Sequence, residues 1–118
     1  GIETCSTVPN TINEMLCMSY RGIIRVFFNW PRSRDASFSR LRAHGAFLVS
    51  SLLEGGEVAH VSVHSEKGRV CRIANPWPGK AVHIEPDDPD CLSETLDGDV
   101  LDISTDPGET FMLTRSDQ

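Results

Sequence analysis

Residues 46–65 read AFLVSSLLEGGEVAHVSVHS, and this stretch decides the expected fold. An apolar-rich run precedes Gly55-Gly56 and a run that alternates apolar with polar residues follows it, and a two-glycine turn between two such runs is typical of an antiparallel hairpin. The alternation predicts that Ala59, Val61 and Val63 face the core, and it sends His60, Ser62 and His64 to the opposite face.

Turn residues separate several further short apolar runs along the chain. We expect strands at 23–28, 69–74, 81–84, 91–96, 100–104 and 110–114, in addition to the hairpin. Many short strands at this spacing indicate a mainly β protein, and we predict an antiparallel β-sandwich, jelly-roll-like, with one short helix before it. Residues 29–43 contain Pro31 and lack strict alternation, so they are expected to form a long ordered loop and the main contact surface.

The expected helix covers residues 10–20. Ile12, Met15, Leu16 and Ser19 follow the i, i+3, i+4, i+7 stripe of a helix, and Asn10 or Thr11 is suited to cap its first turn. The predicted division of the chain is therefore a disordered or artificial leader at 1–9, the helix at 10–20, and a sandwich domain at 21–118.

Composition and charge restrict the classes of function. The 118 residues are 39% hydrophobic and 24% charged, which fits one folded domain, and no apolar run is long enough to span a bilayer. Residues 1–84 hold ten Lys/Arg and six Asp/Glu, whereas residues 85–118 hold one and eleven, for a net charge of −6. Because an acidic chain repels phosphate at long range, we expect neither a nucleic-acid nor a membrane partner.

Motifs for catalysis or metal binding are not evident in the sequence. The four cysteines, Cys5, Cys17, Cys71 and Cys91, include no C-x-x-C pair, so we expect mostly buried free thiols, with Cys71 as a small core residue. Four residues along a strand would separate His60 from His64 by about 13 Å, too far to share an ion. We predict no catalytic residue, no metal site and no cofactor.

Two tryptophans stand beside prolines, in Trp30-Pro31 and Pro76-Trp77-Pro78. An exposed ring in such a setting could stack against a sugar, with Asn75 bonding hydroxyl groups, whereas a buried ring would pin a loop to the core. Both interpretations remain open from the sequence. A carbohydrate-binding site at Trp30, Trp77 and Asn75 is therefore the alternative to a purely structural role.

Six segments of the chain form a recognisable combination: 14–19, 22–31, 41–49, 65–71, 75–77 and 108–111, which include Gly22-Ile23-Ile24, Asn75-Pro76-Trp77 and Gly108-Glu109-Thr110. Together they resemble the C-terminal part of glycoside hydrolase family 95 and its close relatives, which are large bacterial enzymes, often secreted. The resemblance covers most of residues 12–114, although 86–107 carry little of it. The family's helix end is usually similar to Gln-Ser-His, and here it is Met18-Ser19-Tyr20.

The resemblance implies a place in a longer enzyme. In that family an (α/α)-barrel carries the catalysis, of which the best-known is α-L-fucosidase activity, and a β-domain packs on the barrel. Residues 10–20 would be the end of the barrel's last helix, and the catalytic carboxylates would lie upstream of this chain. The implied role is a non-catalytic accessory domain of a secreted or periplasmic parent. We place the expected interdomain contact at Trp30, Arg32, Arg34, Asp35 and Phe38. A free-standing protein-interaction domain is a further possibility.

Overall fold

A computed structural model describes residues 16–27, 30–31, 33–88 and 90–116, which form two β-sheets. The strands are β1 (Cys17–Tyr20), β2 (Ile23–Val26), β3 (Ala36–Ala43), β4 (Phe47–Glu54), β5 (Glu57–Ser65), β6 (Cys71–Ala74), β7 (Val82–Pro86), β8 (Glu94–Leu96), β9 (Val100–Ile103) and β10 (Thr110–Arg115). The smaller sheet has the order β1-β2-β6-β9 and the larger β3-β4-β5-β10-β7-β8. Only β2 and β6 pair in parallel; the other neighbouring strands are antiparallel.

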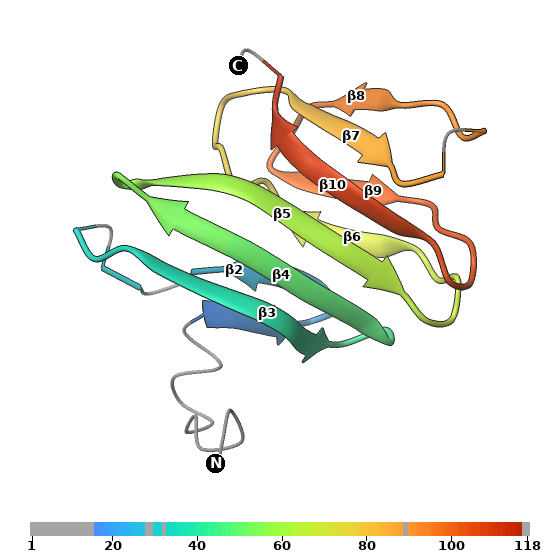
Figure 1. The fold of residues 1–118 in the computed structure, drawn as a ribbon, viewed down its shortest axis with the longest axis horizontal. Coiled ribbons are helices and arrows are strands. Elements are labelled where there is room, and N and C mark those ends of the chain that lie inside the picture. The colour runs from blue at the N-terminus through green and yellow to red at the C-terminus, as the bar shows by residue number, and fades with distance from the viewer. Residues whose placement is uncertain (1–15, 28–29, 32, 89, 117–118) are drawn as a thin grey trace.

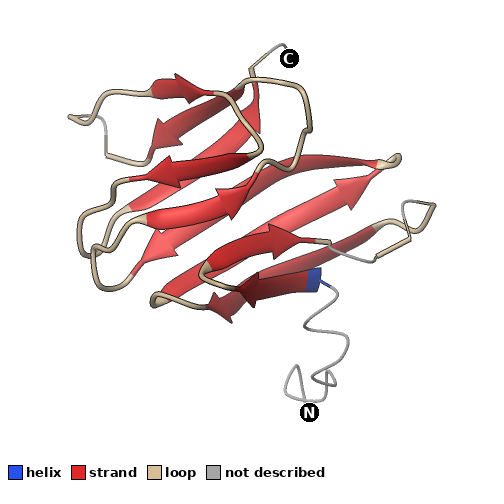
Figure 2. Ribbon diagram, turned by 180° about the vertical axis from the view of Figure 1, so that it is seen from behind, coloured by secondary structure: helices blue, strands red, loops and turns tan. Residues whose placement is uncertain are grey.

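The smaller sheet lies behind the larger one in Figure 1, and the view from behind in Figure 2 shows the same two layers. Both sheets contribute to one buried apolar cluster, since Ile24 and Ile73 come from the smaller sheet and Val61 and Leu113 from the larger. Stacked sheets bury one face each in this way. The prediction of a mainly β protein is confirmed, and the arrangement is sandwich-like.

The predicted hairpin is present as β4 and β5, joined by Gly55 and Gly56, whose φ angles of 63° and 84° fit a two-residue turn. Val61 and Val63 are fully buried as predicted. The register shifts between Leu52 and Leu53, whose partners are His60 and Val58. This bulge leaves Ala59 as the extra residue, so Val58 takes the core position that the sequence assigned to Ala59.

The long loop predicted at 29–43 is wrong for most of its length, because Ala36–Ala43 form β3. β3 pairs with β4 and carries a register shift between Phe38 and Leu41. Arg40, inside the shift, has a φ of 54°. The inward positions therefore change parity, with Phe38 and Ala43 both buried, and the period-2 pattern that would reveal a strand is broken.

The helix predicted at 10–20 is also corrected. Residues 10–15 lie outside the described residues, as does the leader at 1–9, but Cys17–Tyr20 form β1 and pair antiparallel with β2. Arg21 and Gly22 connect the two strands with φ angles of 54° and 76°, the signature of a tight hairpin turn. Sheet pairing outweighs the weak helical stripe, and the sheet begins at Cys17 rather than at residue 21.

Candidate functional site

Asn75, which the sequence predicts as a sugar ligand, forms its side-chain hydrogen bonds within the fold. Its side chain is 8% exposed and follows β6. The amide nitrogen donates to the carbonyl oxygens of Lys80 and Gly98, both at 2.9 Å, and the amide oxygen accepts from the backbone N–H of Trp77 at 2.8 Å. The side chain thereby fixes the loop between β6 and β7 against the turn before β9. Since both donors are used internally, little remains for a sugar hydroxyl.

Trp77 is buried as well, with 4% of its surface exposed. Its indole N–H donates to the carbonyl oxygen of Val58 at 2.7 Å, which ties the β6–β7 loop to β5. A hollow of about 350 Å³ borders its edge, beside the ion pair of Arg115 Nη1 and Glu57 Oε1 at 2.7 Å. A sugar platform needs an exposed ring face. The structure therefore places Trp77 in the core and removes it from the candidate sugar ligands.

The Trp30 side chain is neither fully buried nor fully exposed. It is partly buried against the core, and its indole N–H donates to the carbonyl oxygen of Arg34 at 2.9 Å. The N–H of Arg34 in turn donates to the carbonyl oxygen of Pro31 at 3.1 Å. The ring thus organises the segment before β3 and remains partly accessible to solvent. It is the one predicted aromatic ligand that the structure leaves reachable.

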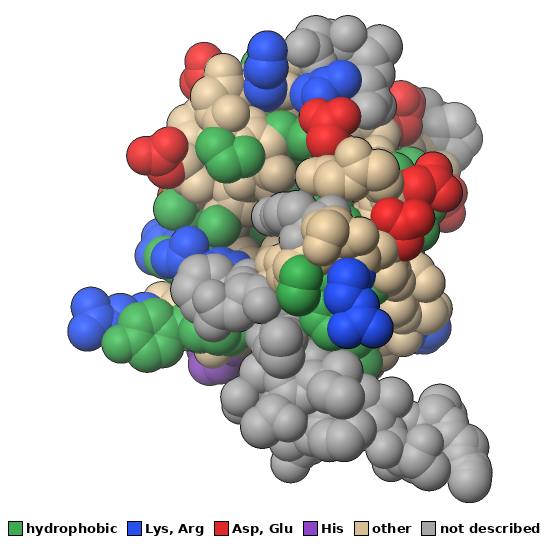
Figure 3. Space-filling view, turned by 90° about the vertical axis from the view of Figure 1, so that its left-hand side faces the viewer, with side chains coloured by type: hydrophobic (Ala, Val, Ile, Leu, Met, Phe, Trp, Pro, Cys, Tyr) green, Lys and Arg blue, Asp and Glu red, His purple; other side chains and the backbone are tan. Residues whose placement is uncertain are grey.

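The residues expected at an interdomain contact divide into two groups. Arg34 and Asp35 are exposed beside Trp30, and Asp35 Oδ1 accepts from the N–H of Gly55 at 3.1 Å. Phe38 is 9% exposed and packs on Phe27 with ring centroids 5.3 Å apart, so it belongs to the core and not to a contact surface. Arg32 lies outside the described residues. Figure 3 faces the end of the molecule where this segment meets the β4–β5 turn.

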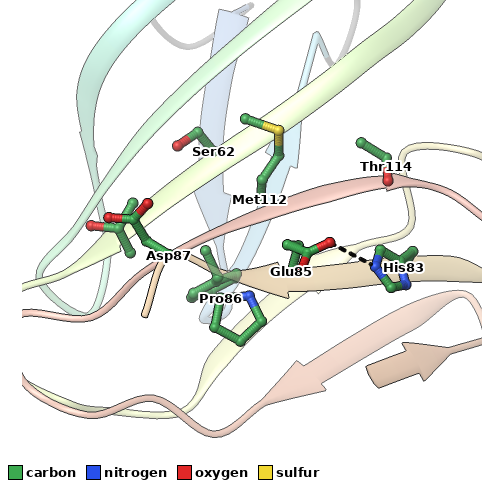
Figure 4. A pocket seen from close by; sticks show the side chains of 9 residues that line it. Ser62, His83, Glu85, Pro86, Asp87, Met112 and Thr114 are labelled. Carbon is green, nitrogen blue, oxygen red and sulfur yellow. Dashed lines mark hydrogen bonds and ion pairs between the residues drawn. The ribbon is translucent and has the colours of Figure 1, made fainter. Parts of the chain in front are cut away.

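A shallow hollow of about 320 Å³ lies on the outer face of the larger sheet (Figure 4). Ser62, Met112 and Glu85 follow one another across β5, β10 and β7 because the register pairs Ser62 with Met112 and Met112 with Glu85. His83 Nε2 lies 3.2 Å from Glu85 Oε1. Hydroxyl, carboxylate and imidazole groups thus line the same hollow as Met112, a residue that is 41% exposed. Sequence reasoning missed this group, since only strand pairing unites three distant segments.

Acidic residues gather at another end of the molecule, where Asp87, Asp88, Asp106 and Glu109 line a hollow of about 260 Å³ together with Cys91. Desolvation and then the carboxylates of Asp88, Glu109 and Asp106 raise the pKa of the Cys91 thiol. Within the described part of the chain, no group of three or more His, Cys, Asp or Glu side chains is arranged to hold a metal ion. Nor is any helix found there that is long and apolar enough to cross a membrane.

Cys71 behaves as the core residue that its position in an alternating strand predicts. It is fully buried, and burial raises the pKa of its thiol from 9.0 to about 12. Burial likewise raises the pKa of Cys17 to about 12. Cys17, Cys71 and Cys91 are all free, while Cys5 lies outside the described residues. Because a thiolate is the reactive form, Cys17 and Cys71 are inert packing groups at neutral pH.

Comparison with known proteins adds no relative to this description. The chain matches no protein-family model, and a search of curated proteins finds no match.

Proposed function

We propose that this chain is a non-catalytic accessory β-domain of a larger glycoside hydrolase of the family-95 type. Its two sheets would form a jelly-roll-like sandwich that packs on an (α/α)-barrel, and the barrel would carry the catalytic carboxylates. The proposal draws on the sequence segments that resemble the C-terminal part of that family, and on the mainly β structure into which these segments fold.

The observation that carries the proposal is that polar side chains in the segments resembling family 95 form hydrogen bonds inside the fold. Asn75 and Trp77 direct their side-chain polar groups to backbone partners inside the fold. Ser65, in another such segment, is fully buried and its hydroxyl accepts from the N–H of Gly68 at 3.0 Å. Buried, hydrogen-bonded polar residues of this kind fix loop geometry. The resemblance therefore lies in residues that build a scaffold, as an accessory domain requires.

We place the contact with the barrel at the solvent-accessible members of the predicted set, which are the partly buried Trp30 and the exposed Arg34 and Asp35. In the parent enzyme, Arg34→Glu should lower the melting temperature of the β-domain by a few degrees, because an interdomain contact would lose a favourable charge and gain a repulsion. The same substitution in the 118-residue chain should have little effect, since the Arg34 side chain is exposed there. Differential scanning calorimetry of both proteins measures the effect.

Lys67→Glu provides the matched control, because Lys67 is also exposed but lies between β5 and β6. It reverses a charge elsewhere on the same domain and should leave the parent's melting temperature nearly unchanged. Equal melting temperatures for the parent and its Arg34→Glu variant would contradict the proposed contact.

A carbohydrate-binding module is the second candidate, and the partial accessibility of Trp30 favours it. We expect tryptophan emission to remain unchanged when the chain is titrated with L-fucose, galactose, xylose or their oligosaccharides up to millimolar concentration. The reason is that Trp77 is buried and Trp30 already bonds Arg34. A saturable change that disappears in Trp30→Ala, together with heat of sugar binding by isothermal titration calorimetry that is lost in Trp30→Ala but retained in the conservative Trp30→Phe, would instead establish sugar stacking on this ring.

A further inference from the structure

Charge is separated across the molecule along the order of the strands. Every charged residue between Leu16 and His44 is an arginine except Asp35, and the segment supplies β1, β2 and β3. Every charged residue between Glu85 and Glu109 is an acid, and that segment runs from β7 through β8 and β9. β1 and β3 are edge strands, while β8 and β9 are the opposite edges of the same sheets. The edge formed by β1 and β3 is therefore mainly basic, and the edge formed by β8 and β9 is mainly acidic.

The two basic edge strands are joined to each other. The N–H of His44, in the turn after β3, donates to Ser19 Oγ of β1 at 2.9 Å. We define the β1–β3 edge by five exposed residues of β1, β3 and the turns that follow these two strands: Tyr20, Arg21, Arg40, Arg42 and His44. Arg42 Nη1 forms an ion pair with Glu66 Oε1 at 2.7 Å. The charges of Arg21 and Arg40 are therefore the ones on this edge whose role needs an explanation.

Arg21 and Arg40 both adopt left-handed backbone conformations, with φ angles of 54°. Such a conformation costs a residue with a Cβ roughly 1 kcal/mol, and asparagine or glycine usually takes it at tight turns. Neither arginine forms a salt bridge among the residues that the structure describes. The fold therefore bears a backbone cost at two exposed arginines whose charges no carboxylate of the described residues neutralises, a pattern associated with function.

Arg21 is also held in place by a neighbour. Its guanidinium carbon lies 5.2 Å from the centre of the Tyr20 ring, within the range of a cation–π contact, and Tyr20 is 52% exposed. An exposed tyrosine with an arginine stacked on it presents an apolar surface and a fixed cation together. Tyrosine and arginine are, with tryptophan, the residue types enriched at the energetic hot spots of protein interfaces.

We propose that the β1–β3 edge docks an acidic protein surface, with Arg21 and Arg40 each meeting a carboxylate and Tyr20 covering apolar atoms of the partner. A protein suits this edge better than a nucleic acid, because a long polyanion would also approach the acidic side of a chain whose net charge is −6. The inference is independent of the proposed function, since it uses a different surface from Trp30, Arg34 and Asp35.

The test uses the 118-residue chain and a fluorescein-labelled octaglutamate peptide, followed by fluorescence anisotropy at 50 mM salt. Arg21→Asn removes the charge and keeps a residue that tolerates the turn, so the variant should fold at least as stably as the parent sequence. We expect about threefold weaker binding for Arg21→Asn and about tenfold for Arg21→Asn combined with Arg40→Asn. Arg21→Lys should retain most of the affinity, and binding should weaken as salt is raised.

Arg34→Asn is the matched control, because it removes another exposed arginine, which lies before β3 and outside the edge. An equal loss of binding in this control would show a diffuse charge effect and overturn the proposal. Tighter binding of a 12-base-pair DNA duplex than of octaglutamate would overturn it in favour of a nucleic acid. Self-association that is detected by sedimentation and abolished by Arg21→Asn would assign the edge to a second copy of the chain and would also overturn it.

Discussion

Replacing Trp77 by alanine should lower the free energy of unfolding by about 4 kcal/mol, the usual cost of deleting a large buried aromatic ring. Trp77 is 4% exposed and belongs to the common apolar cluster, and its N–H is bonded to Val58 at 2.7 Å. The loss would be a large part of the 5–15 kcal/mol that stabilises a typical domain. Urea denaturation followed by far-ultraviolet circular dichroism measures it independently of tryptophan emission.

Two variants separate the contributions to this loss. Trp77→Phe keeps most of the apolar volume and removes the donor to Val58, so it should cost about 1–2 kcal/mol. Trp30→Ala deletes a ring that is only partly buried and should cost clearly less than Trp77→Ala. If Trp77→Ala changed stability by less than 1 kcal/mol, the ring could not be part of the core, and the sugar-platform interpretation of Trp77 would return.

Regular alternation was sufficient to predict the central strands. The β4–β5 hairpin, the burial of Val61 and Val63 and the core position of Cys71 all follow from period-2 patterns and a Gly-Gly turn. The errors occur where a bulge or a hairpin turn interrupts the period. The register shift beside Arg40 breaks the alternation in β3, so this strand was predicted as a loop. The bulge at Ala59 places Val58 in the core position predicted for Ala59. The Arg21-Gly22 turn pairs β1 with β2 where the sequence predicted the end of a helix.

The candidate site was harder to predict than the fold, because side-chain accessibility depends on tertiary packing. A tryptophan flanked by prolines has the same sequence signature whether its ring is exposed or buried. The hydrogen bond to Val58 shows that the Trp77 ring is held inside the fold. The hydrogen bond to Arg34 shows that the Trp30 ring is held against the segment before β3. Likewise Ser62, Glu85 and Met112 share a hollow through strand pairing between segments that are more than twenty residues apart.

Gly68→Ala should destabilise the chain by about 3 kcal/mol. Gly68 has a φ of 74°, and a Cβ atom added there would lie 2.5 Å from Cδ and 2.7 Å from the backbone nitrogen of Pro107. The left-handed conformation accounts for roughly 1 kcal/mol, and overpacking against backbone adds about 1–3 kcal/mol. The loop cannot yield easily, because Ser65 bonds Gly68 through its hydroxyl and Gly108 and Glu109 through its backbone.

Gly79→Ala is the control that isolates the contact with Pro107. Gly79 has a φ of 80°, yet an added Cβ would meet no atom within 4 Å, so only the conformational cost of roughly 1 kcal/mol should remain. Urea denaturation of both variants gives the two free energies. A clear excess for Gly68→Ala would establish that the β5–β6 and β9–β10 connections are packed rigidly together, whereas equal losses would mean that the segment around Pro107 moves aside and does not brace Gly68.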